Sequence, residues 1–157
     1  MIEIKDNFLP EDDLQSFYTF CLNAPWYYGE RDAPHYEPTG LMTPLKKGDF
    51  WYNVFEEVFE ENFQITQKVY RMYVNFFIPG EQPHFHKDGP PGQKTMLFYP
   101  NPYNDLDNGG ETKFVINEEI RSIPPVTNRA ILFDAHIWHS ASSFRKDPRF
   151  TLAMKMR

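Results

Sequence analysis

Two segments in the first 64 residues repeat apolar side chains at helical spacing. The acidic triplet Glu11–Asp13 opens the first, which continues with Leu14, Phe17, Tyr18, Cys21 and Leu22. The second, "FWYNVFEEVFEE" from Phe50 to Glu61, sets an apolar stripe opposite a row of glutamates. Because residues three and four apart share one face of a helix, both patterns predict amphipathic helices. The proline- and glycine-rich stretch Pro25–Gly48 shows no period and predicts a long loop, of the length that often forms a lid.

From Thr66 onward the pattern changes to short alternating runs that are separated by Gly, Pro and Asn. The runs are Thr66–Ile78, His84–Asp88, Lys94–Pro100, Glu111–Ile116, Ile120–Ile123, Ala130–Asp134, Ile137–Ala141 and Arg149–Met156. Alternation of this kind is typical of half-buried strands, and strands without helices between them favour an antiparallel jelly roll. We therefore predict one α+β, mainly β domain over residues 1–157, with a helical support and loop over 1–64 and a jelly-roll core over 65–157.

Composition and charge narrow the classes of function. A formal net charge of −6 and a pI near 5.3 disfavour nucleic acid and anionic membranes as partners, although "RKDPRFTLAMKMR" at the C-terminus is locally basic. Cys21 is the only cysteine, so there is no internal disulfide and no thiolate zinc site. The chain begins without a signal-peptide pattern and holds no apolar stretch of transmembrane length, so we expect a cytoplasmic protein.

The stretch "QPHFHKDGPPG" holds the first candidate for chemistry. Residues two apart on a strand face the same side, so His86 and Asp88 can point into one cavity. A lone His-x-Asp is a weak signal, because two turn residues that share a surface hydrogen bond would look the same. His84 has the same parity, and a supporting role for it stays open.

A second pair of histidines lies in "LFDAHIWHSASSF". His136 and His139 differ by an odd number of residues, so an extended strand turns only one of them inward. We select His139, which lies within the run Ile137–Ala141, and leave His136 as a surface or supporting residue. Two imidazoles and one carboxylate leave three positions of an octahedron open, which favours a non-haem iron over tetrahedral zinc.

The last run adds a candidate anion site. Arg149 and Thr151 share strand parity, so a guanidinium and a hydroxyl can hold one carboxylate of a dicarboxylate co-substrate. The alternative for Arg149 is a charge at a sheet edge. Arg71, Tyr73 and Asn75 also alternate with apolar neighbours, and their face meets either the pocket or solvent.

Together these motifs resemble the Fe(II)/2-oxoglutarate-dependent oxygenase superfamily, nearest its prolyl-4-hydroxylase-like and phage or marine-bacterial branch. The resemblance runs from about Tyr70 to the C-terminus and comprises His86-x-Asp88, "FYPN" around Tyr99, "NGGET", "LFD…WHSAS" around His139 and "RFT" from Arg149. It implies a double-stranded β-helix of the cupin-like type. Iron would be held by His86, Asp88 and His139, and 2-oxoglutarate by Arg149, Thr151 and Tyr99.

The resemblance implies a dioxygenase that uses Fe(II), 2-oxoglutarate and dioxygen to hydroxylate an unactivated carbon and releases succinate and carbon dioxide. Two other classes stay open: a cupin-like metal-binding module or isomerase without 2-oxoglutarate, and a structural domain whose histidines are ordinary. The substrate is a small molecule or a peptidyl group, proline-like by resemblance, and the oligomeric state is not predicted. A lid would come from Pro25–Gly48 or from "KDGPPGQK" after His86.

Overall fold

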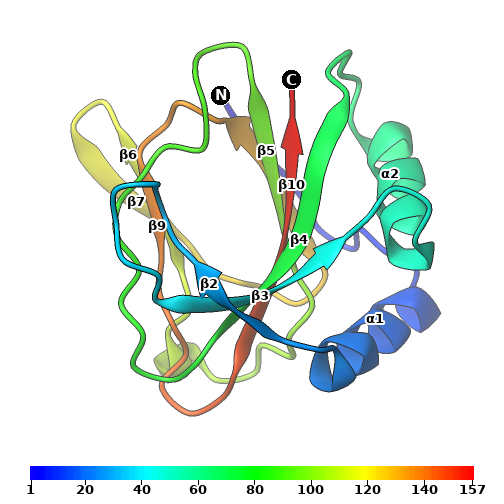
Figure 1. Cartoon of the computed structure of the whole chain (residues 1–157), viewed down its shortest axis with the longest axis horizontal. Helices are drawn as coiled ribbons and strands as arrows, with labels where there is room; N and C mark the ends of the chain where they lie inside the picture. Colours follow the sequence, from blue (N-terminus) through cyan, green and yellow to red (C-terminus); the bar gives the residue numbers. More distant parts are fainter.

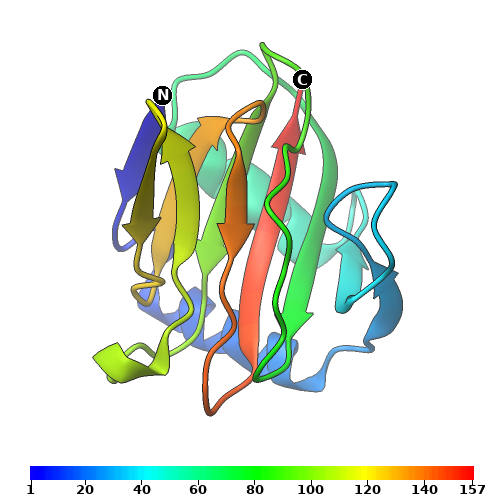
Figure 2. The same cartoon turned by 90° about the vertical axis from the view of Figure 1, so that its left-hand side faces the viewer.

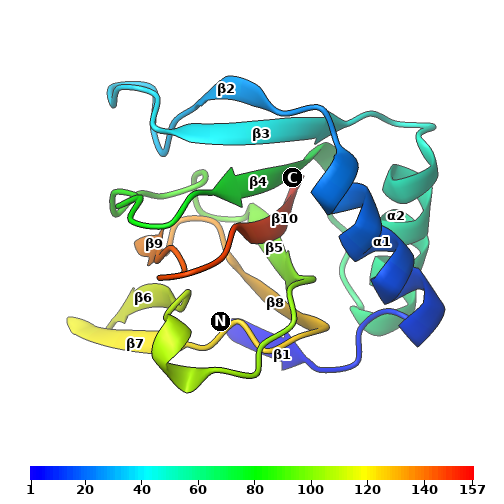
Figure 3. The ribbon, with the colours of Figure 1, turned by 90° about the horizontal axis from the view of Figure 1, so that it is seen from below.

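The computed structural model describes residues 1–157 and consists of two antiparallel sheets with two helices (Figure 1). The larger sheet has the strand order β1-β8-β5-β10-β4-β3-β2 and the smaller one β7-β6-β9. Figure 3 shows the helices on one side of the larger sheet and the smaller sheet on the other. The elements are β1 (Ile2–Lys5), α1 (Glu11–Asn23), β2 (Tyr27–Glu30), β3 (Gly40–Leu45), α2 (Phe50–Asn62), β4 (Val69–Phe77), β5 (Lys94–Tyr99), a 3₁₀ turn (Leu106–Asn108), β6 (Thr112–Ile116), β7 (Glu119–Ile123), β8 (Arg129–Asp134), β9 (His139–Ala141) and β10 (Arg149–Met156).

Strand β10 lies in the middle of the larger sheet and is buried at every position. It pairs with β4 on one side and with β5 on the other. Its side chains alternate between two environments, as the pleat of a strand requires. Phe150, Leu152, Met154 and Met156 belong to the main apolar core, whereas Arg149, Thr151, Ala153 and Lys155 line a cavity on the opposite face.

Both helices lie where the hydrophobic spacing places them, and they cover the apolar face of the larger sheet. Phe17 of α1 and Phe55 of α2 are fully buried, with ring centroids 4.7 Å apart. Cys21 is also fully buried, and burial raises the pKa of its thiol, so it belongs to the core. Each predicted apolar stripe included one residue that is not buried: Leu22 in α1 is 55% exposed, and Phe50 in α2 is 67% exposed.

The prediction of a plain loop over Pro25–Gly48 was wrong, because this stretch contains β2 and β3. Strand β3 pairs with β4 along its length, whereas β2 pairs only with its first part, where Tyr27 lies opposite Met42. Pro44 therefore lies where β3 has a neighbour on one side only, a position that tolerates a missing N–H. With β1 paired to β8, strands from the first 45 residues complete the larger sheet.

The run His84–Asp88 is not a strand, which contradicts the sequence prediction. His86 forms a single bridge with His139, with N–H to carbonyl distances of 2.9 and 3.0 Å. Prolines 83, 90 and 91 flank this segment and lack the N–H groups that a longer ladder needs. Figure 2 shows the segment in green beside the orange-brown β9. The other seven predicted runs correspond to β4 through β10.

Neither helix has the length and apolar character that a membrane crossing requires.

We predict that Phe55→Ala destabilises the protein by about 3–5 kcal/mol, because it leaves a cavity between both helices and the sheet. Phe50→Ala on the same helix is the matched control, since Phe50 is 67% exposed, and we expect a change within about 0.5 kcal/mol. Chemical denaturation of both variants measures the difference. Equal losses would mean that α2 does not pack through the Phe55 face.

Candidate active site

A cavity of about 560 Å³ lies on the inner face of the larger sheet. Alternate residues of β4 and β10 form its floor, including Tyr73, Asn75 and Ala153. His139 comes from the smaller sheet. The stretch from β2 to β3 contributes residues 29–34 and 39–41, so this hairpin covers part of the opening.

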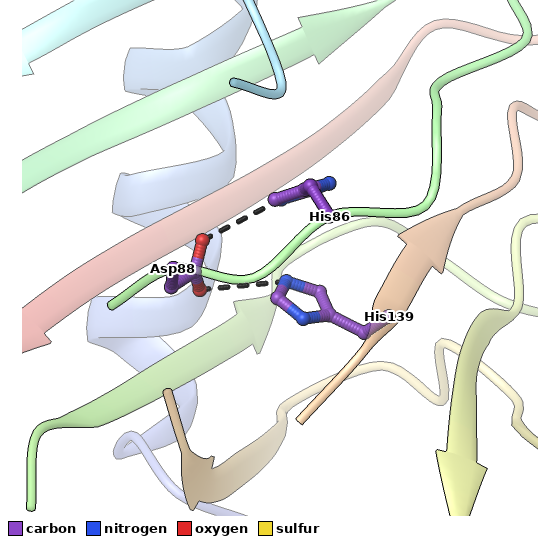
Figure 4. Close-up of side chains that lie close together, drawn as sticks. All are labelled: His86, Asp88 and His139. Atoms are coloured by element: carbon purple, nitrogen blue, oxygen red, sulfur yellow. Dashed lines mark ion pairs between the residues drawn. The ribbon is translucent and has the colours of Figure 1, made fainter. Parts of the chain in front are cut away.

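The three predicted metal ligands come together in this cavity (Figure 4). One ligand atom from each of His86, Asp88 and His139 lies within 4.8 Å of the others. The Nε2 atom of His86 is 3.5 Å from Asp88 Oδ1, and the Nε2 atom of His139 is 3.4 Å from Asp88 Oδ2. The bridge between His86 and His139 brings the two imidazoles side by side, which a sequence separation of 53 residues could not show.

Backbone carbonyls fix the orientation of both imidazole rings. His86 Nδ1 lies 3.0 Å from the carbonyl oxygen of His84, and His139 Nδ1 lies 2.9 Å from that of Ile137. A carbonyl only accepts, so each Nδ1 carries a proton and each Nε2 faces Asp88, where it would bind a metal ion through its lone pair in place of a proton. Two such nitrogens facing one carboxylate fit a divalent metal ion, and a carbonyl on the far nitrogen is the usual support for a metal-binding histidine.

Asp88 is held ionised by the groups around it. Burial raises the pKa of this carboxyl, but Lys155 and both imidazoles outweigh that effect and hold it well below its usual range. Thr95 Oγ1 donates to Asp88 Oδ2 over 2.8 Å, and the Lys155 ammonium forms an ion pair with the same oxygen. Lys155 is not among the site residues that the sequence predicts. Its parity with Arg149 and Thr151 on the last strand was the available signal.

Arg149 is a buried cation without an anionic partner. Only 1% of the residue is exposed, and no carboxylate forms an ion pair with it. Its nitrogens donate to the Gly110 carbonyl at 2.9 Å, Thr151 Oγ1 at 2.6 Å and Thr112 Oγ1 at 3.2 Å. Burial lowers the pKa of the guanidinium. A buried charge with neutral acceptors alone is costly, so this end of the cavity is suited to an anion.

The backbone at Gly110 packs tightly beside Arg149. Its backbone has φ of +87°, and an added Cβ would lie 2.2 Å from the ring of Phe144. Only glycine combines that conformation with that contact. The conformation directs the Gly110 carbonyl at Arg149 Nε, so "NGGET" positions the guanidinium.

Tyr99 lies behind the cavity wall. It is 1% exposed, is not among the cavity-lining residues, and shares a 2.7 Å hydrogen bond with Thr112 Oγ1. Its effect on a ligand is therefore transmitted through Thr112 and Arg149. Glu81 lines the same end of the cavity, and burial raises the pKa of its carboxyl to about 7.

Of the other residues that the sequence left open, four contribute to the site and one does not. Arg71, Tyr73 and Asn75 line the cavity, so the polar face of β4 meets the pocket and not solvent. His84 supports the site through its carbonyl, while its ring stacks on Tyr36 at 4.1 Å. His136 belongs neither to the metal cluster nor to the cavity lining.

The β2–β3 hairpin is fastened over the metal end by charged contacts. Glu30 lies 3.5 Å from Arg71 Nη2. Asp32 accepts a 2.6 Å hydrogen bond from the His84 N–H and lies 3.7 Å from His86 Nδ1. Of the alternative lid "KDGPPGQK", only Lys87 and Asp88 line the cavity. The hairpin, within Pro25–Gly48, is therefore the covering segment.

Comparison with known proteins identifies the fold. No protein-family model matches the chain, and no curated protein matches its sequence. Among solved structures, a prolyl-4-hydroxylase from Pseudomonas putida superposes with a TM-score of 0.78 at 12% identity, over 99% of this chain and 91% of that one.

Two further structures agree. A prolyl hydroxylase from Trichoplax adhaerens, in complex with a peptide fragment of hypoxia inducible factor, gives a TM-score of 0.78 at 17% identity, over 99% of this chain and 82% of that one. An oxidoreductase of the 2OG-Fe(II) oxygenase family from Burkholderia pseudomallei gives 0.77 at 11% identity, over 99% and 84%. The chain therefore has the jelly-roll fold of these oxygenases, as the sequence analysis predicted.

We predict that His86→Ala abolishes tight binding of a divalent metal, because it removes one of three converging ligands. His136→Ala is the matched control and should bind metal as the wild type does, since His136 lies outside the cluster. Isothermal titration of the metal-free proteins with Mn(II) measures both. Loss of binding in His136→Ala, with retention in His86→Ala, would contradict the proposed ligand set.

Proposed function

We propose that this chain is a single-domain Fe(II)- and 2-oxoglutarate-dependent dioxygenase, spanning residues 1–157, that hydroxylates an unactivated carbon. One observation carries the proposal: a His-Asp-His cluster suited to a metal shares a cavity with a buried arginine that has no anionic partner. A dicarboxylate that binds metal at one end and arginine at the other satisfies both. The shared fold with solved 2OG-Fe(II) oxygenases supports the same conclusion.

In this proposal, His86 and His139 hold the metal through Nε2, and Asp88 holds it through one carboxylate oxygen. Three protein ligands leave coordination positions open for a bidentate co-substrate and dioxygen. Bound iron together with 2-oxoglutarate and dioxygen would supply the oxidising power that no side chain has, with succinate and carbon dioxide as the co-products. The chain itself provides position and charge.

Arg149 and Thr151 bind the distal carboxylate of 2-oxoglutarate in this proposal. Arg149 has five N–H donors in a fixed plane, and the structure assigns three hydrogen bonds to them. The remaining donors are available to a carboxylate. Thr112 and Tyr99 form a buried chain of hydroxyls behind Arg149, which holds the guanidinium in place.

The walls between the two ends keep the reacting atoms away from water. Phe77, Leu97 and Ala153 contribute apolar surface to the lining. The hairpin, held by the contacts of Asp32 and Glu30, covers part of the opening at the metal end. A site that excludes water strengthens the electrostatic contacts inside it and limits side reactions.

The substrate in this proposal is a small molecule or a peptidyl group with a proline-like ring. The peptide in the Trichoplax adhaerens complex supports a peptidyl substrate. A cupin-like metal-binding module or isomerase without 2-oxoglutarate is the second candidate. Such a module would use the metal cluster, but it would not require a buried arginine without an anionic partner in the same cavity.

An anaerobic visible spectrum tests the reaction class. We expect a charge-transfer band that requires both Fe(II) and 2-oxoglutarate and is absent from His86→Ala. If iron binds and no band follows the addition of 2-oxoglutarate, the oxygenase proposal fails and the metal-binding module takes its place.

We predict that Arg149→Gln weakens 2-oxoglutarate binding by about 100-fold or more and changes Fe(II) binding by less than about threefold. The reason is that a charge-assisted, bidentate contact is lost at the co-substrate end only. Arg129→Gln is the control, because Arg129 pairs with Asp6 and does not line the cavity. Titration of each ligand, followed by the band, measures both affinities. A parallel loss of iron and 2-oxoglutarate would refute this role of Arg149.

A further inference from the structure

Lys155 is a second buried cation in the cavity, at the opposite end from Arg149. It is 6% exposed and lies on the inner face of β10, six residues after Arg149. At about 3.4 Å per residue, their Cα atoms are roughly 20 Å apart along the strand. The two cations therefore cannot bind the same carboxylate.

The surroundings of Lys155 contain one strong partner. Its ammonium forms an ion pair with Asp88 Oδ2 and lies 5.9 Å from the centre of the Tyr73 ring. Burial lowers the pKa of Lys155, but the charge of Asp88 outweighs it, and the net shift is upward. Arg71, opposite Lys155 on β4, lies near Glu30 on the hairpin. Asp88 is thus the only carboxylate that forms an ion pair with Lys155.

The register of the sheet explains why Lys155 and Thr95 meet the same oxygen. Thr95 of β5 lies directly opposite Lys155 of β10. Thr95 Oγ1 donates to Asp88 Oδ2 over 2.8 Å, and Lys155 pairs with that oxygen too. Asp88 Oδ1 faces His86 Nε2 and receives neither of these donors, whereas Oδ2 receives both and also lies 3.4 Å from His139 Nε2. The two carboxylate oxygens are therefore in different environments.

We propose that Lys155 is a permanent counter-ion of Asp88, which with Thr95 occupies Oδ2, restricts the metal to Oδ1 and lowers the affinity of the site for the metal. A carboxylate held at one oxygen gives a single ligand atom and leaves three coordination positions open. The inference rests on the metal site of the proposed function, and not on the identity of the substrate.

The two effects of Lys155 have opposite signs, which makes them separable. Without metal, Lys155 neutralises a buried carboxylate, and its removal leaves an unpaired buried charge, which is strongly destabilising. With metal bound, the Lys155 ammonium would repel a divalent ion held by the same carboxylate. In a buried site this repulsion would outweigh the roughly 10- to 100-fold in affinity that an outer-shell hydrogen bond contributes. Removal of Lys155 therefore weakens the fold and strengthens metal binding.

The test compares wild type, Lys155→Met and Lys155→Arg after removal of metal with a chelator. We expect Lys155→Met to melt roughly 10 °C below wild type without metal, and to bind Mn(II) about tenfold or more tightly in isothermal titration. Lys155→Arg keeps the charge and should stay near wild type in both measurements. Lys146→Met is the matched control, because Lys146 forms an exposed ion pair with Asp105 at 2.9 Å.

A second comparison, between Asp88→Asn and the double variant Asp88→Asn/Lys155→Met, tests the proposal if Lys155→Met alone does not fold. In the Asp88→Asn background the carboxylate charge is gone, so Lys155→Met should lower the melting temperature by half as much or less. An equal loss in both backgrounds would mean that Lys155 acts by packing alone and would overturn the proposal. Unchanged or weaker Mn(II) binding in Lys155→Met would also overturn it, whereas no Mn(II) binding in wild type would refute the metal site itself.

Discussion

The burial of β10 on both faces is the constraint on which this structure depends. Phe150, Leu152, Met154 and Met156 join the core beneath the helices, so the alternate positions must face the cavity. Two of those positions are Arg149 and Lys155, whose charges are buried at 1% and 6% exposure. A strand that packs both helices against the sheet thereby also sets two cations at fixed places in the site.

The two cations have opposite surroundings, and this difference divides the cavity. Arg149 donates to two hydroxyls and a carbonyl, and no carboxylate forms an ion pair with it. Lys155 is paired with Asp88. An anionic ligand gains most beside Arg149, because a paired cation must first give up its partner. In the proposed function, these electrostatics favour the co-substrate at the Arg149 end and the metal at the Asp88 end.

Elements and site residues that depend on local periodicity could be predicted from the sequence. Those that depend on contacts between segments far apart in the chain could not. Helical spacing placed α1 and α2, and strand parity favoured His139 over His136, in agreement with the cluster. Pro44 concealed β3, because a proline argues against a strand unless one side of it is known to be open. Lys155 was missed because its partner, Asp88, lies 67 residues earlier in a segment that is not a strand.

The difference between local periodicity and distant contacts also explains why the reaction class can be proposed from the sequence more readily than the substrate. The co-substrate end is built from β10, β4 and the "NGGET" turn, where parity and glycine conformation restrict each side chain. The covering hairpin is held by Glu30, Asp32 and Tyr36, whose contacts with Arg71 and His84 are between side chains or to a single N–H. Such contacts can change without disturbing the sheet, which keeps one fold among chains of 11–17% identity. In the proposed function, the hairpin would therefore set the substrate specificity, and the strands beneath it would hold the metal and the co-substrate.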